Sequence, residues 1–158
     1  MKKTPLHIKY PPSEPCGCEV CRNYCARPGW WTVEQAKKAM AGYADRMMVE
    51  VSPELDFGVL SPAFRGCEGG VALQNFAKNG CNFFRDGLCE LHPTGLLPLE
   101  CAFCHHERVG LGIKCHLDLE KDWKTEKGKQ LVYGWLKERR IDRKTLFQVI
   151  DSRRGFKL

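Results

Sequence analysis

Ten cysteines provide most of the chemistry available to this chain of 158 residues. Four of them, Cys16, Cys18, Cys21 and Cys25, form the pattern C-x-C-x2-C-x3-C, which we call the N-terminal cysteine run. Thiolates this close together can wrap one metal ion with little loop-closure entropy, at a zinc–sulfur distance of about 2.3 Å. The run therefore predicts a metal site, and its last three cysteines also match the end of the bacterial ferredoxin pattern.

A second group of cysteines follows in the other half of the chain. Cys101 and Cys104 form a C-x2-C knuckle, and Cys115 and His116 come next to each other further on. Such a knuckle with a later cysteine or histidine is a common zinc-binding arrangement. Neighbours on an extended strand point in opposite directions, so we expect only one of Cys115 and His116 to bind, and we select Cys115.

Catalysis by a bound metal would need an open coordination position. The polar candidates near the knuckle are His92, His105, His106 and Glu107, and no nucleophile–base pair is evident in the sequence. His105 and His106 could also supply a nitrogen ligand or a hydrogen bond to sulfur, or be ordinary loop histidines. The sequence therefore assigns no enzyme class.

The cysteines Cys81 and Cys89 flank the clearest β-strand pattern. Asp86-Gly87 separates two short apolar stretches, as the two-residue turn of a β-hairpin requires. In that register Phe84 opposes Cys89 and Cys81 opposes His92, so the two cysteines point to opposite faces unless the strand is bulged. Cys67 stands apart from the other cysteines and fits a buried apolar residue as well as a ligand.

In a reducing compartment most cysteines stay as free thiols, so ten closely spaced cysteines indicate metal binding rather than disulfide bonds. Residues 1–15 are polar and contain prolines, with no apolar stretch of the kind that targets a chain for export. We therefore expect a cytoplasmic protein with no membrane association. The same reasoning disfavours covalent haem attachment at Cys101, Cys104 and His105, because that reaction usually follows export.

The formal net charge of +6 is concentrated at the C-terminus. Residues 137–158 hold eight basic and three acidic side chains. A solvated helix face explains this better than nucleic-acid binding through a basic C-terminal helix, which stays the less favoured alternative. The sequence names no protein partner and excludes none.

The elements that position these residues can be outlined from periodicity. Thr32 and Gln35 predict a capping box for a helix whose apolar residues are Val33, Ala36, Met40, Tyr43, Ala44 and Met47. We expect residues 1–31 and 52–70 to be irregular, a short helix over 71–78, and helical segments over 119–139. Asp142 is expected to cap a final amphipathic helix.

The segment from Cys81 to Cys101 resembles the YkgJ-like cysteine-cluster family of zinc- or iron-chelating domains. The positions that carry the resemblance are Cys18, Cys21, Cys25, Cys81, Cys89, Leu91, His92, Pro98 and Cys101. It covers residues 16–116 and lacks the adjacent Cys-Cys pair often found in the first cluster. The resemblance implies metal chelation by cysteines from both halves of the chain, and it implies no reaction.

Together these patterns predict a single small α+β domain over residues 1–158. It would comprise a cysteine-rich metal-binding region (16–116) with one β-hairpin and a helical C-terminal region (119–158). We expect zinc held by thiolates in a structural or regulatory role, with an iron–sulfur cluster in electron transfer or redox sensing as the alternative. The candidate ligands are Cys16, Cys18, Cys21, Cys25, Cys81, Cys89, Cys101, Cys104 and Cys115.

Overall fold

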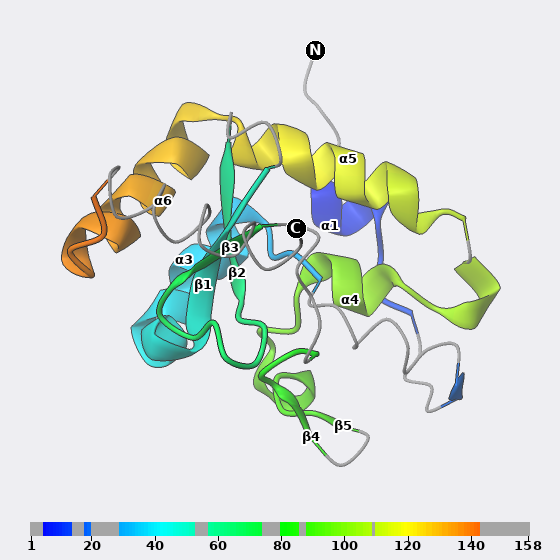
Figure 1. The fold of residues 1–158 in the computed structure, drawn as a ribbon. Coiled ribbons are helices and arrows are strands. Elements are labelled where there is room, and N and C mark those ends of the chain that lie inside the picture. Colours follow the sequence, from blue (N-terminus) through cyan, green and yellow to red (C-terminus); the bar gives the residue numbers. More distant parts are fainter. Residues whose placement is uncertain are drawn as a thin grey trace, which may run out of the picture.

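A computed structural model describes residues 5–13, 18–19, 29–52, 57–73, 80–85, 88–108 and 110–142. In this part of the chain, helices surround a small mixed sheet, and a two-stranded hairpin lies at one end (Figure 1). The helices and strands are α1 (Leu6–Lys9), α3 (Val33–Tyr43), β1 (Met47–Val51), β2 (Gly58–Pro62), β3 (Val71–Leu73), β4 (Phe84–Arg85), β5 (Leu88–Cys89), α4 (Leu99–Phe103), α5 (Gly112–Trp123) and α6 (Glu126–Glu138). Three 3-10 helices, η2 (Ala44–Arg46), η3 (His92–Thr94) and η4 (His106–Arg108), complete the set. The predicted α+β class is confirmed.

Helix α3 begins where the sequence predicts. The hydroxyl of Thr32 accepts the backbone N–H of Gln35, and the Gln35 side chain accepts the N–H of Thr32, each at 3.1 Å. This reciprocal pair is the capping box. The apolar stripe is shorter than predicted, because the α-helix ends at Tyr43 and Met47 opens strand β1.

The three-stranded sheet was not predicted. Strand β1 lies at its centre, antiparallel to β2 with Met47 opposite Pro62, and parallel to β3 with Val49 opposite Val71. The prediction of a loop over 52–70 is wrong at β2, and the predicted helix over 71–78 is wrong at its start. All five residues of β1 are buried, so the alternation that identifies a half-exposed strand is missing from the sequence.

The predicted hairpin is confirmed in its register but is shorter than expected. Phe84 pairs with Cys89 in β4 and β5, and the N–H of Glu90 donates to Phe83 O at 2.8 Å. The expected pairing of Cys81 with His92 is wrong, because Cys81 forms a bridge with Phe64 instead. The turn at 86–87 lies outside the described residues.

The two long C-terminal helices cover the sheet from one side (Figure 1). Helix α5 begins at Gly112, earlier than predicted, so Cys115 and His116 lie on a helix rather than on an extended strand. Helix α6 begins after Thr125, whose hydroxyl accepts the N–H of Gly128 at 3.3 Å. The final helix predicted after Asp142 lies outside the described residues.

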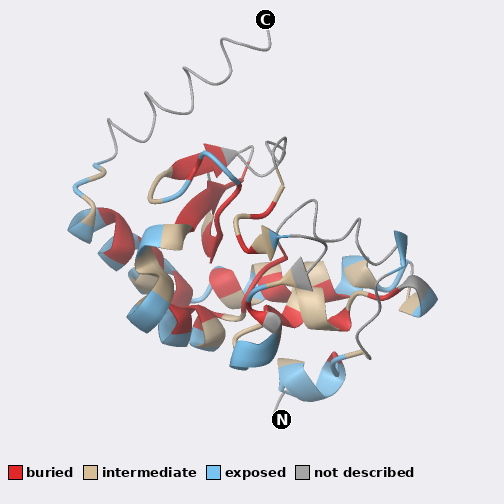
Figure 2. Ribbon diagram, turned by 90° about the horizontal axis from the view of Figure 1, so that it is seen from below, coloured by how far each residue is buried: buried red, intermediate tan, exposed pale blue. Residues whose placement is uncertain are grey.

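Tryptophans form much of the core. Trp30, Trp31, Trp123 and Trp135 are all almost fully buried, and Figure 2 shows buried residues on the sheet and on the inward faces of the helices. The Trp123 indole donates to Trp31 O at 2.8 Å, which joins α5 to the extended segment before α3. None of the described helices is both long and apolar enough to cross a membrane.

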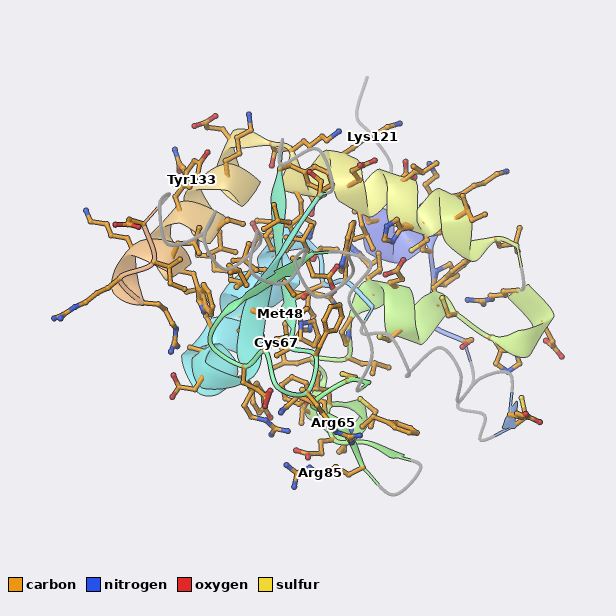
Figure 3. The ribbon with its side chains drawn as sticks, in the orientation of Figure 1. Met48, Arg65, Cys67, Arg85, Lys121 and Tyr133 are labelled. Atoms are coloured by element: carbon orange, nitrogen blue, oxygen red, sulfur yellow. The ribbon has the colours of Figure 1, made fainter. Side chains whose placement is uncertain are left out.

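A second, smaller hydrophobic cluster contains Cys67. It packs with Met48, Ala63, Phe64 and Ala72, and Figure 3 shows Met48 and Cys67 close together. Cys67 is buried within this cluster. This placement matches the alternative in which Cys67 is an apolar core residue.

Candidate metal centre

The helices α4 and α5 bring three of the predicted ligands into one region. Cys101 and Cys104 are half-buried at α4, and the N–H of Cys104 donates to Glu100 O at 3.0 Å, which continues the helical turn. Helix α5 packs against α4 (Figure 1). A Cβ on Gly112 would lie 3.5 Å from the Cys104 sulfur, so the first turn of α5 borders this thiol.

A carboxylate and an imidazole join the two helices beside these thiols. Glu100 Oε2 lies 2.7 Å from His116 Nδ1, and Glu100 Oε1 accepts the Trp30 N–H at 3.0 Å. The His116 ring lies over the Trp30 ring with centroids 4.0 Å apart and an interplanar angle of 31°. Glu100 and Cys104 are i and i+4 on α4, and Gly112 and His116 are i and i+4 on α5. The two helices therefore meet with Glu100 opposite His116 and Cys104 opposite Gly112.

The chain enters the N-terminal cysteine run from the same pair of helices. The Ser13 N–H donates to Ala102 O at 2.7 Å, and the Ser13 hydroxyl donates to the same oxygen at 3.0 Å. Just before it, Tyr10 OH donates to Asp118 Oδ2 on α5 at 2.5 Å. Arg108 Nη1 also donates to Pro11 O at 2.6 Å. Residues 10–13 are thus fixed along α4 and α5.

The chain leaves the run at α4 as well. Trp30 and Glu100 exchange two hydrogen bonds, because the Glu100 N–H also donates to Trp30 O at 3.3 Å. Gly29 lies against Cys101, and a Cβ on Gly29 would be only 2.6 Å from the Cys101 sulfur. Glycine is what permits this approach. Both ends of the segment 14–28 therefore lie on the helix that holds Cys101 and Cys104.

Cys115 is fully buried on the inward stripe of α5 with Leu119 and Trp123. Burial raises the pKa of its thiol to about 12, and the negative charges of Glu100, Cys104 and Asp118 act in the same direction. The neutral thiol is thus strongly favoured at Cys115 in the metal-free protein.

The buried His105 takes a definite tautomer. Its Nδ1 accepts the N–H of Glu107 at 3.2 Å, so the neutral ring carries its proton on Nε2. The His105 Nδ1 atom is thus engaged as a hydrogen-bond acceptor. Glu107 is exposed in η4, and His92 and His106 lie in η3 and η4.

The structure describes three of the remaining predicted ligands, and they lie on separate segments of the chain. Cys81 is buried beside Phe64, Cys89 is half-buried on β5, and Cys18 is exposed. Cys16, Cys21 and Cys25 lie outside the described residues. In the part of the chain that the structure describes, no three Cys, His, Asp or Glu side chains form a group arranged to hold a metal ion. None of the described cysteines is in a disulfide.

Two residues of this region were missed or set aside by the sequence reasoning. Glu100 was not considered, and His116 was set aside in favour of Cys115. The sequence contained a signal for both residues, because Glu100 directly precedes Cys101 and His116 directly follows Cys115. An earlier start for α5 would have placed His116 one turn after Gly112, on the same face.

The chain matches no protein-family model, no curated protein and no solved structure.

Proposed function

We propose that this protein binds a metal, zinc in the first instance, through cysteine thiolates, in a structural or regulatory role. The ligands would come from the N-terminal cysteine run and from Cys101 and Cys104 on α4. Cys115, Cys81 and Cys89 complete the set of thiols that the sequence predicts.

One observation carries the proposal: Ser13 and Gly29, which flank the run, both lie against α4. Bringing the two ends of this segment to α4 costs conformational entropy. Hydrogen bonds and packing that need no metal therefore largely offset that cost. The free energy of metal–thiolate bonds is then available for affinity and for ordering the segment between them.

The chemistry of the donor set supports zinc or iron. Cys101 and Cys104 are half-buried, so a metal bound there would be partly shielded from water while keeping an entry path. Two thiolates on one turn of helix cannot complete a tetrahedral site, and the run offers the further soft donors that zinc prefers. A reducing, cytoplasmic setting, which the sequence predicts, keeps such thiols available.

An iron–sulfur cluster is the second candidate, and the spacing of Cys18, Cys21 and Cys25 favours it because it matches most of the ferredoxin pattern. Such a centre would serve electron transfer or redox sensing. The resemblance to a zinc- or iron-chelating family supports either metal equally.

The test is an anaerobic purification of the full chain, followed by elemental analysis and a visible spectrum of the same sample. We expect about one or two zinc ions per chain and no visible absorption, as for closed thiolate sites. Iron with sulfide and a broad band at roughly 400 nm would instead establish the second candidate. A reduced, folded chain that retains neither metal and takes up neither on reconstitution would refute both.

Variants locate the site. The double variant C101S/C104S should lose bound metal, whereas Cys67→Ala, which removes a thiol from the small hydrophobic cluster, should keep the full metal content. Equal metal content in C101S/C104S and the wild type would exclude α4 as part of the site.

A further inference from the structure

We propose that one side of helix α5 binds the surface of an anionic lipid bilayer. This side, which we call the outer face of α5, consists of the exposed residues of the segment 111–124, namely α5 and its two capping residues. They are Leu111, Ile113, Lys114, Leu117, Lys121 and Lys124. The inference does not depend on the metal proposed above.

Every exposed residue of this segment is either aliphatic or a lysine. Ile113 and Leu117 are 68% and 49% exposed and lie one turn apart, and Lys121 follows one turn later on the same stripe. Three of the five large hydrophobic side chains exposed in the described part of the chain belong to this face. Single exposed apolar residues are ordinary, but a group of them rimmed by charged residues indicates an interaction surface.

The opposite side of α5 fixes the direction of this face. Cys115, Leu119 and Trp123 are fully buried and anchor the helix to the core. Figure 3 shows Lys121 on the side of α5 that lies away from the sheet. The outer face therefore stays at the surface of the folded domain.

The acidic residues of α5 are engaged by other elements and are only partly exposed. Asp118 Oδ2 accepts hydrogen bonds from Tyr10 and from Lys9, and Asp122 accepts the Val33 N–H at 2.8 Å. These contacts hold both carboxylates against the segments that flank α5. The lysines of the outer face consequently dominate its charge.

The surrounding surface has the sign that attracts anionic lipids. Across residues 111–140, seven exposed residues are basic and two are acidic, whereas the other described residues expose five basic and seven acidic side chains. The further basic residues, on and just after α6, are Lys127, Lys129, Lys137 and Arg140. Positive charge on the described surface is thus concentrated along α5 and α6, where a negative headgroup layer would attract it.

The aliphatic side chains distinguish a bilayer from other anionic partners. Binding to a nucleic acid uses cations for phosphates and aromatic rings for bases, and it gives exposed leucine and isoleucine no role. Binding to a bilayer uses both groups of residues, because it depends on apolar area buried at the headgroup boundary and on attraction between cations and anionic lipids. A protein partner would need a groove that fits this convex helix face, whereas a fluid headgroup layer adapts to it.

This proposal replaces the expectation of no membrane association. That expectation depends on the lack of a long apolar segment, which a helix needs in order to span a bilayer. A helix that lies on the surface needs only one apolar face with cations beside it.

Sedimentation of the full chain with lipid vesicles tests the proposal. The wild type should bind phosphatidylcholine vesicles that contain roughly one-third phosphatidylserine, and it should not bind pure phosphatidylcholine vesicles. Binding should weaken as the salt concentration rises, because salt screens exposed charges. A single-stranded oligonucleotide is the competing anionic ligand.

Two double variants separate the apolar and the electrostatic contributions. I113Q/L117Q keeps every charge and should weaken vesicle binding by at least about tenfold, since it removes the apolar area that would be buried. K114Q/K121Q should weaken it by about 10–30-fold, because each lysine near an anionic surface contributes about fivefold. The matched control is K37Q/K38Q, which removes the same charge from exposed lysines of α3 and should change binding by less than about threefold.

The remaining outcomes overturn the proposal. It is wrong if the wild type does not bind the anionic vesicles, or if it binds the oligonucleotide instead. Equal vesicle binding by I113Q/L117Q and the wild type would show that α5 does not enter the headgroup layer. If I113Q/L117Q does not fold, Leu117→Trp decides, because brominated acyl chains should quench the fluorescence of the added indole, and fluorescence that stays unquenched refutes the inference.

Discussion

The substitution Gly29→Ala probes the contact between the N-terminal segment and Cys101. The new Cβ would lie 2.6 Å from the Cys101 sulfur, 3.0 Å from the Cys101 backbone nitrogen and 3.2 Å from Glu100 Cβ. Ordinary van der Waals contact begins at 3.4 Å, so the sulfur must retreat by about 0.8 Å. The two other contacts involve the helix itself, so rotating the Cys101 side chain relieves only part of the overlap.

This displacement is large on the scale of a metal site, because ligand distances hold to within about 0.2 Å of their ideal values. We therefore expect Gly29→Ala to weaken metal binding by at least about tenfold, by removing Cys101 from its place. Overpacking should also lower the free energy of unfolding of the metal-free chain by roughly 1–3 kcal/mol.

The assay is a chelator competition for metal affinity, paired with denaturant unfolding of the metal-free protein. Gly134→Ala is the control, since a Cβ at Gly134 meets nothing within 4 Å and lies within helix α6. It should leave affinity unchanged and stabilise the protein by about 0.5–1 kcal/mol. If the free energy of unfolding of Gly29→Ala falls as expected but the variant binds metal as tightly as the wild type, Cys101 is not a ligand.

Two further predictions concern the helices around the site. Burial holds the pKa of Cys115 at about 12, so the folded metal-free chain keeps a proton that the unfolded chain releases above about pH 8.5. Its stability should therefore fall as pH rises from there toward 12, and Cys115→Ala should reduce that slope in pH-dependent denaturant unfolding; an equal slope in both proteins contradicts the assignment. Gly128→Ala would place a Cβ 2.5 Å from Trp123 O, where α5 turns into α6. We expect this overlap to lower the free energy of unfolding by roughly 1–3 kcal/mol, measured by thermal unfolding, whereas the control Gly134→Ala should raise it. A thermally unperturbed Gly128→Ala would show that the corner relaxes freely.

Local signals in the sequence predicted several elements correctly. The capping box at Thr32 and Gln35 and the hairpin register at Phe84 and Cys89 depend on neighbours a few residues apart, and both are confirmed. The central sheet depends on partners that the local pattern does not contain. Strand β1 is buried on both sides, and its parallel partner β3 is only three residues long, so neither shows the period of two that identifies a strand.

The residue types of the candidate site can be read from the sequence, but the placement of those residues cannot. The sequence identified Cys101, Cys104 and Cys115, because their spacing is a chemical pattern in itself. It placed Cys115 and His116 on an extended strand, and that assumption eliminated His116. On helix α5 the two neighbouring side chains point in different directions around the helix axis. Cys115 is therefore buried in the core, and His116 contacts Glu100.

The packing of Trp30 explains why Gly29, a few residues after the N-terminal cysteine run, lies against α4. A buried indole next to Gly29 fixes the point where the N-terminal run ends, and the two hydrogen bonds between Trp30 and Glu100 fix it against the residue before Cys101. Since these contacts belong to the tryptophan-rich core, they do not depend on the metal that we propose. Loss of metal should then disorder the cysteine-dense segment without unfolding the domain. Hydrogen exchange of the metal-free chain tests this, because protection kept at Trp30 and α5 agrees with the reasoning and a global loss of protection refutes it.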